Sequence, residues 1–167
     1  MADPLFKVGV LGATGCIGSP YRAEIRECKE AEIVALCARR QDLLAKAVRE
    51  DQAQVATQDW REVVEHPDVN LVVVGTPDAL HHEAVVACAA QGKHLLCEKP
   101  VGMNAAQAEE MWGLYRDAQP ALAHFVPFWT RMVGVFEVAR DLVGSGELGE
   151  IVSTVFRWPN PRPATMP

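Results

Sequence analysis

Residues 94–100 read His-Leu-Leu-Cys-Glu-Lys-Pro, and this stretch decides how the rest of the chain is interpreted. Its apolar residues turn abruptly polar at Glu98 and Lys99, as a buried parallel strand does when it ends at a site. Open α/β sheets bind ligands at the carboxyl ends of their strands, so Lys99 is predicted to lie where chemistry is done. Pro100 favours an extended backbone at Lys99. The alternative is a solvated loop lysine.

Two earlier segments repeat this pattern of an apolar strand followed by a turn. Residues 71–82 begin Leu-Val-Val-Val and break at Gly75-Thr76-Pro77 before a helix begins. Residues 6–18 run from Phe-Lys-Val-Gly-Val-Leu into Gly-Ala-Thr-Gly-Cys-Ile-Gly. Three strands therefore end in polar or glycine-rich turns, and these ends are expected to meet at one edge of a sheet.

The turn after the first strand has the spacing Gly-x-x-Gly-x-x-Gly. Such glycines let the backbone turn tightly, approach a pyrophosphate and pack a helix closely on a strand. The pyrophosphate would then meet the N–H groups and positive end of the following helix. Ala13 departs from the regular Gly-x-Gly-x-x-Gly pattern, and no Gly-Lys-Ser/Thr follows that would favour a kinase-type loop. The turn predicts a dinucleotide site formed by Gly12, Ala13, Thr14, Gly15, Cys16 and Ile17.

The end of the second expected strand carries the sequence Ala38-Arg39-Arg40. Domains that select NAD place an acidic residue here, whereas arginine accommodates the 2′-phosphate of NADP. Guanidinium groups make bidentate, permanently charged contacts with phosphate. We therefore predict that Ala38, Arg39 and Arg40 bind the cofactor and that NADP is preferred over NAD. The alternative is that one arginine merely covers the solvent side of the next helix.

Strand and helix patterns alternate up to residue 126, with apolar runs predicting strands and helical spacing predicting helices. Alternation with short turns implies an α/β fold with a Rossmann-type, doubly wound parallel sheet. Asn104 is expected to cap the helix that follows it. The expected strands are 5–11, 32–38, 54–57, 71–74, 94–97 and 121–126, and the expected helices are 16–29, 41–50, 60–65, 79–91 and 105–118.

The pattern changes after residue 126. Residues 131–143 predict a helix, and residues 150–158 alternate as a strand. A single strand cannot form a sheet and would expose an edge, so a partner or a second copy in a homo-oligomer is expected to cover it. We divide the sequence into a dinucleotide-binding domain, 1–126, and the start of a truncated α+β substrate or oligomerisation domain, 127–167.

Together, the glycine turn, Thr76-Pro77-x-x-x-His81 and Gly92-Lys93-His94-x-x-x-Glu98-Lys99-Pro100 resemble the Gfo/Idh/MocA family of NAD(P)-dependent oxidoreductases. The resemblance covers most of residues 5–158. It implies a hydride transfer between the nicotinamide and a sugar, polyol or related alcohol or carbonyl substrate. Family members are about twice as long, and their second domain adds catalytic residues that this chain lacks.

The same resemblance implies roles for the residues after the fourth and fifth strands. Thr76 and Pro77 would lie along the ribose and nicotinamide half of the cofactor, with His81 beside them. Glu98 would position Lys99 or touch the nicotinamide ribose. Lys99 would be catalytic, hydrogen-bonding the reacting oxygen of the substrate, and Lys99-Pro100 is a candidate cis peptide. A histidine in the first turn of a helix is more often structural than catalytic, which is the alternative for His81.

Composition argues against several classes of protein. The chain has 167 residues and a net charge of −6, with no basic patch, which argues against a nucleic-acid surface. No apolar run reaches the roughly 20 residues needed to cross a bilayer, and no signal peptide is evident. The five cysteines are widely spaced, so neither a disulfide framework nor a metal site is predicted, and buried free thiols suit a reducing cytoplasm.

Three functions stay open at this point. The first is the NADP(H)-dependent oxidoreductase, or a fragment of one. The second is a non-catalytic NADP(H)-binding module or sensor subunit that lacks a complete substrate domain. The third is a short-chain reductase-like epimerase, which is disfavoured because neither Tyr21 nor Tyr115 is followed by the Tyr-x-x-x-Lys lysine.

Overall fold

The computed structural model describes residues 6–155 and 157. The chain forms two compact units, Met1–Pro127 and Phe128–Pro167, and each is described by itself. The division of the sequence into domains 1–126 and 127–167 stays a prediction about the intact protein.

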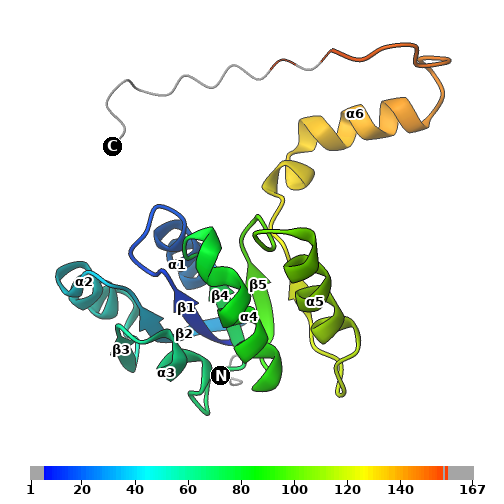
Figure 1. Ribbon diagram of the computed structural model, residues 1–167. Coiled ribbons are helices and arrows are strands. Elements are labelled where there is room, and N and C mark those ends of the chain that lie inside the picture. Colours follow the sequence, from blue (N-terminus) through cyan, green and yellow to red (C-terminus); the bar gives the residue numbers. More distant parts are fainter. Residues whose placement is uncertain (1–5, 156, 158–167) are drawn as a thin grey trace. The chain divides into compact units, whose positions relative to one another are not determined.

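The first unit is built on a six-stranded sheet whose strands are all parallel (Figure 1). Their spatial order is β3-β2-β1-β4-β5-β6, so the chain winds outward from β1 in one direction and then, from β4, in the other. This confirms the predicted Rossmann-type, doubly wound sheet. The strands are β1 (Phe6–Leu11), β2 (Ala31–Cys37), β3 (Val55–Thr57), β4 (Leu71–Val74), β5 (His94–Cys97) and β6 (His124–Phe125).

Helices cover both faces of this sheet, because alternate strand residues point to opposite sides. Val8, Val10 and Val73 belong to a core with α1 and α2, whereas Leu11, Val72 and Val74 belong to a core with α3, α4 and α5. Strands buried on both faces explain the continuous apolar runs in the sequence. The helices are α1 (Gly18–Glu27), α2 (Gln41–Asp51), α3 (Trp60–Val64), α4 (His81–Ala90) and α5 (Ala105–Arg116).

The predicted boundaries hold best where turn residues bracket an apolar run. Strands 71–74 and 94–97 are confirmed, and Asn104 caps α5 by accepting a 3.0 Å hydrogen bond from Gln107 N. The predicted helix 79–91 instead opens with the 3-10 turn η1 (Asp78–Leu80). The predicted strand 121–126 shortens to two residues, because this edge strand has one neighbour and pairs with Leu95 and Leu96 alone.

The second unit contains a 3-10 turn, η2 (Trp129–Met132), and the helix α6 (Gly134–Gly144). The helix predicted over 131–143 is therefore present but begins later. The strand predicted over 150–158 is wrong for its described part, since residues 151–155 have no strand structure. An isolated strand has no neighbour to satisfy its backbone, and Val152 stays 93% exposed. Residues 156 and 158 lie outside the described part of the chain.

Among the described residues, no helix combines the length and the apolar character that crossing a membrane requires.

Candidate cofactor site

Three strands end level with one another at the carboxyl edge of the sheet. Leu11, Val74 and Cys97, the last residues of β1, β4 and β5, form one row across neighbouring strands. The hydrogen bonds Gly75 N to Leu11 O and Glu98 N to Val74 O, both 3.0 Å, extend this row by one residue. The order of the strands reverses direction between β1 and β4, and open sheets bind ligands at such a point. The glycine turn, Thr76 and Lys99 are thus brought to one edge, as predicted.

The glycine turn approaches its neighbours too closely for side chains. Gly12 has a φ of +79°, and a Cβ there would lie 2.5 Å from the carbonyl oxygen of Gly75 on the neighbouring strand. Gly18, the first residue of α1, packs directly on the backbone of Gly12 and Ala13. The turn is therefore a cradle of bare backbone that begins at the tip of β1.

Some backbone N–H groups of this turn are bonded and others are free. Those of Gly12 and Ala13 donate to Cys37 O, each at 3.0 Å, and that of Gly15 donates to Gly12 O at 2.9 Å. Those of Cys16 and Ile17 have no partner within residues 6–155 and precede α1, which has no side-chain cap and no acid in its first turn. A helix start of this kind suits an anion.

This arrangement refines the predicted cofactor contacts of the turn. The Ala13 side chain is fully buried and its N–H donates to Cys37 O, so neither group is free, and the contact of Ala13 with the cofactor stays a prediction. Gly15, Cys16 and Ile17 are exposed at the mouth of the turn, and Thr14 is half-buried beside them.

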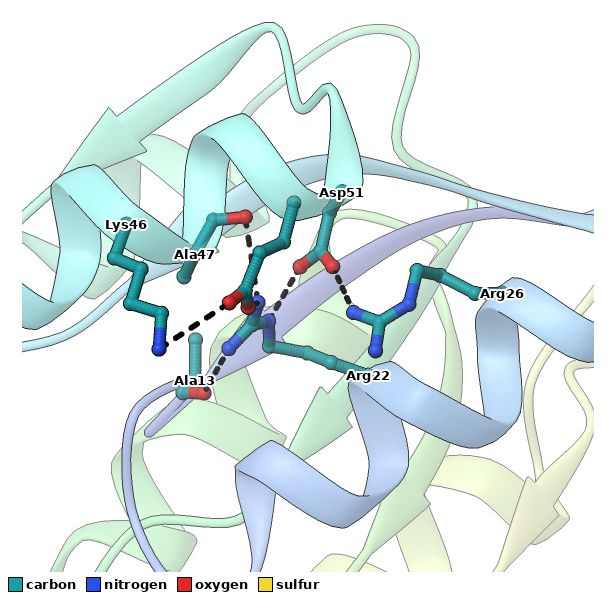
Figure 2. A network of polar contacts seen from close by, with 7 residues as sticks. Ala13, Arg22, Arg26, Lys46, Ala47 and Asp51 are labelled. Atoms are coloured by element: carbon teal, nitrogen blue, oxygen red, sulfur yellow. Dashed lines mark hydrogen bonds and ion pairs between the residues drawn. The ribbon is translucent and has the colours of Figure 1, made fainter.

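A buried arginine donates a hydrogen bond to the carbonyl oxygen of Ala13 in the glycine turn (Figure 2). Arg22 of α1 donates to Ala13 O at 3.4 Å and to Ala47 O of α2 at 3.3 Å. It also pairs with Asp51 and, at 2.9 Å, with Glu50 at the end of α2. The Asp51 carboxylate is fully buried and is shared with Arg26. The network fixes the turn against α2, the helix that follows the β2 tip.

The positive charge of Arg22 and the negative charges of Asp51 and Glu50 stabilise one another. Burial alone would lower the pKa of Arg22, but its hydrogen bonds to Asp51 and Glu50 outweigh burial and raise it. The same guanidinium lowers the pKa of Glu50. The sequence analysis missed Arg22, although its place four residues after Gly18 on the helix face nearest the turn was a usable signal.

The tip of β2 presents two arginines in different states. Ala38 is buried and its N–H donates to Thr57 O at 3.1 Å, so its contact with the cofactor stays a prediction. Arg40 pairs with Asp42 at 2.8 Å. Arg39 is exposed, and its guanidinium forms no ion pair with any described residue. Arg39 is therefore the cation at this tip that is not already neutralised.

The tip of β4 holds a polar atom that nothing in the protein satisfies. Thr76 Oγ1 is the one buried side-chain nitrogen or oxygen among the described residues that lacks a hydrogen-bond partner. Pro77 follows it and is exposed. A buried hydroxyl without a partner is costly, which marks Thr76 as a position for a ligand.

His81, the first residue of α4, is fully buried. Its Nδ1 lies 2.9 Å from Pro100 O and its Nε2 lies 2.9 Å from Thr76 O. Both ring nitrogens are thus engaged with the backbone. This agrees with the structural alternative, and the contact of His81 with the cofactor stays a prediction.

The tip of β5 holds the predicted catalytic lysine. Lys99 is exposed, and the Lys99-Pro100 peptide is cis, as predicted. Glu98 is half-buried; its Oε1 accepts a 2.7 Å hydrogen bond from the Tyr21 hydroxyl, and its Oε2 accepts one from Lys99 N at 3.1 Å. Burial and the bond to Glu98 raise the pKa of Tyr21. No motif predicts the contact between Tyr21 and Glu98, because the two residues lie 77 positions apart.

These residues fit a nicotinamide dinucleotide. The free N–H groups of Cys16 and Ile17 lie just before α1. Arg39, which has no ion-pair partner among the described residues, follows β2, and the Thr76 hydroxyl, which has no hydrogen-bond partner there, follows β4. Among the described residues, no cluster of His, Cys, Asp or Glu has the arrangement of a metal site.

Comparison with known proteins places this geometry in a family. The family described as "Oxidoreductase family, NAD-binding Rossmann fold" matches residues 6–124. Levoglucosan dehydrogenase of Pseudarthrobacter phenanthrenivorans is 32% identical over 112 residues, covering 67% of this chain and 28% of that protein. Myo-inositol 2-dehydrogenase of Thermotoga maritima is 30% identical over 159 residues, covering 94% of this chain and 47% of that protein.

A solved structure shares the fold. Scyllo-inositol dehydrogenase from Lactobacillus casei, with bound NAD(H) and scyllo-inositol, matches with a TM-score of 0.80 at 23% identity, covering 87% of this chain and 42% of that one. The chain thus spans less than half the length of each of these relatives. Because the family match covers most of its residues, the chain belongs to the Gfo/Idh/MocA oxidoreductase family and carries that family's NAD-binding Rossmann fold.

Proposed function

We propose that this chain is the cofactor-binding part of an NADP(H)-dependent oxidoreductase that acts on a sugar, polyol or related alcohol or carbonyl compound. The observation that carries the proposal is the row of strand ends: the glycine turn, Thr76 and Lys99 follow β1, β4 and β5 in register. Neighbouring strands lie about 4.8 Å apart, so Lys99 stands roughly 10 Å from the glycine turn, within the length of a dinucleotide. The names of the relatives, an inositol and a levoglucosan dehydrogenase, support the substrate class.

Each residue of the site has a distinct task in this proposal. The N–H groups of Cys16 and Ile17 hold the pyrophosphate, and Thr76 Oγ1 bonds the nicotinamide half. The bound nicotinamide supplies or accepts the hydride. The Lys99 ammonium hydrogen-bonds the reacting oxygen of the substrate, stabilises the negative charge that develops there and exchanges a proton with it. Its exposure leaves the amine accessible to a substrate.

The experiment is a titration of the chain with NADPH and NADH, followed by an assay of hydride transfer with a panel of polyols and aldoses. Lys99→Met should change the dissociation constant of NADPH by less than about three-fold and abolish transfer. An equal loss of binding and transfer would make Lys99 a binding residue. Cofactor binding without transfer to any substrate would favour the non-catalytic module, and absence of cofactor binding would end the proposal.

The preference for NADP rests on Arg39. Its guanidinium has no acidic partner among the described residues, whereas Arg40 is already paired with Asp42. Arg39→Gln should therefore weaken NADP by about ten-fold or more and leave NAD nearly unchanged, as expected for the loss of a charge-assisted contact with phosphate. Arg40→Gln is the matched control and should have a smaller effect. If either variant weakens both cofactors alike, the assignment of the 2′-phosphate is wrong.

A further inference from the structure

Lys99 stands between two residues that side chains from other elements hold in place. Glu98, on one side, is bound by Tyr21 of α1. Pro100, on the other side, is bound through its carbonyl oxygen by His81 of α4. Neither holding residue lies next to Lys99 in the sequence, and they come from opposite faces of the sheet.

The contact from α1 is short and charge-assisted. The Tyr21 hydroxyl donates to Glu98 Oε1 at 2.7 Å, while Glu98 Oε2 receives the backbone N–H of Lys99 at 3.1 Å. A hydrogen bond to a carboxylate is among the stronger contacts a tyrosine makes. The Tyr21 hydroxyl thus reaches the Lys99 backbone through one carboxylate. Tyr21 lies three residues after Gly18, so the same helix carries the free N–H groups of the glycine turn at its start.

The contact from α4 joins two strand ends. The His81 ring lies between Thr76 O, after β4, and Pro100 O, after β5, with a ring nitrogen 2.9 Å from each. Both oxygens are acceptors, so a neutral ring donates to one of them and contacts the other. The ring is fully buried, so water does not compete for these carbonyl groups. His81 therefore fixes the Pro100 side of Lys99 relative to the residue whose hydroxyl has no partner.

We propose that Tyr21 and His81 are positioning residues, which hold the backbone of Lys99 from both sides and set its amine relative to the glycine turn and Thr76. The inference rests on the proposed role of Lys99. Tyr21 also packs against the core on its face of the sheet, so a test has to separate its hydroxyl from its ring.

Tyr21→Phe makes that separation, because it removes the hydroxyl and keeps the ring. The backbone N–H of Lys99 should exchange with solvent about three- to ten-fold faster, as the loss of one hydrogen bond predicts. Tyr115→Phe is the matched control: its hydroxyl donates to Lys93 O at 3.1 Å in the buried core, away from Lys99. Y115F should leave the exchange at Lys99 unchanged even if it lowers stability more.

A spectroscopic measurement reports on the amine itself. Lysines are reductively methylated with ¹³C-labelled formaldehyde, and K99R identifies the signal of Lys99. Y21F should shift this signal, because the released Glu98 carboxylate moves relative to the amine. Y115F should not shift it. Added to Glu98→Ala, Y21F should have no further effect on the exchange, since its hydroxyl acts through that carboxylate.

The outcomes separate this inference from the proposed function, because these measurements use the ligand-free chain and need no turnover. Faster exchange in Y21F alone supports the positioning role even if K99M retains hydride transfer. Unchanged exchange at Lys99 in Y21F, or equal acceleration in Y21F and Y115F, overturns it. His81→Gln tests the other side; if it does not fold, the result with Y21F decides.

Discussion

Replacing Arg22 with methionine should destabilise the first unit much more than replacing Arg26 with methionine. Both guanidinium groups pair with the same carboxylate, that of Asp51. They differ in surroundings: the Arg22 side chain is 6% exposed, and that of Arg26 is 40% exposed. The pair of variants therefore isolates the effect of burial on one ion-pair network.

The magnitude follows from the contacts that each change removes. Arg22→Met breaks two charge-assisted bonds and two long ones to Ala13 O and Ala47 O. Removing one partner of a buried pair costs about 3–5 kcal/mol. Asp51 keeps Arg26, and Glu50 keeps Lys46 at 3.6 Å, so the low end applies, about 3 kcal/mol. Arg26→Met should cost about 0.5–1 kcal/mol, as expected for a partly exposed pair.

Urea unfolding measures both values. The midpoint of R22M should fall by about 1–2 M with an unchanged slope, and that of R26M by less than about 0.5 M. Equal losses in the two variants would refute the reasoning, because they would mean that burial of the Arg22 guanidinium adds nothing.

The pH dependence supplies a second check on the same network. Arg22 lowers the pKa of Glu50 below its ordinary value of 4.5. A carboxyl whose pKa is lowered by folding adds stability above its unfolded pKa and loses it as the pH falls through its folded pKa. The gap in stability between the wild type and R22M should therefore be widest near neutral pH and narrow below about pH 4.

Two further predictions concern the glycine turn. Gly12→Ala should cost more than the roughly 1–2 kcal/mol of a left-handed backbone, because its Cβ meets Gly75 O, and it should abolish cofactor binding. Gly92→Ala, with a φ of +65° and open space around it, should cost about 1 kcal/mol in thermal unfolding and leave binding intact; similar effects on binding would contradict the cradle. In a thiol-reagent assay, two of the five cysteines should react quickly, the exposed Cys16 and Cys28. NADPH should protect Cys16, at the turn, and not Cys28; equal protection of both would count against the site.

The three buried thiols, those of Cys37, Cys88 and Cys97, should react slowly in the same assay. Burial is the main cause that raises the pKa of Cys37 to about 11 and the pKa values of Cys88 and Cys97 to about 12. A thiol reacts as the thiolate, so these three should react after the protein opens.

Much of the fold was predictable because the strands of a parallel sheet are recognisable in the sequence as apolar runs between turn residues. β4 is buried on both faces, and β5 is buried on one face and half-buried on the other, so each contains an apolar run between turn residues, and their bounds were predicted correctly. β6 lies at the edge of the sheet and pairs at two positions, and its apolar run therefore overstates its length. The strand predicted over 150–158 failed for a related reason: alternation describes a face, but a strand also needs a neighbour.

The site was predictable in its positions and not in its contacts. Short motifs located the strand tips, because chain direction and winding order place carboxyl ends together. They did not show which groups are already satisfied. For example, nothing in the sequence indicates that the N–H groups of Ala13 and Ala38 donate to Cys37 O and Thr57 O. Lys93, in the family-like Gly-Lys-His, is a core residue whose ammonium donates to His66 O and Val69 O and whose pKa burial lowers.

Helix α1 does more than begin the dinucleotide site, because its adjacent residues Tyr21 and Arg22 reach to opposite halves of the sheet. Arg22 binds the last turn of α2 and the carbonyl oxygen of Ala13, and Tyr21 binds Glu98 after β5. The helix therefore lies at the point where the winding reverses, and the free N–H groups of Cys16 and Ile17 precede its first turn. In this arrangement the glycine turn and Lys99 share one rigid support, so their spacing does not depend on the flexibility of the loops that carry them.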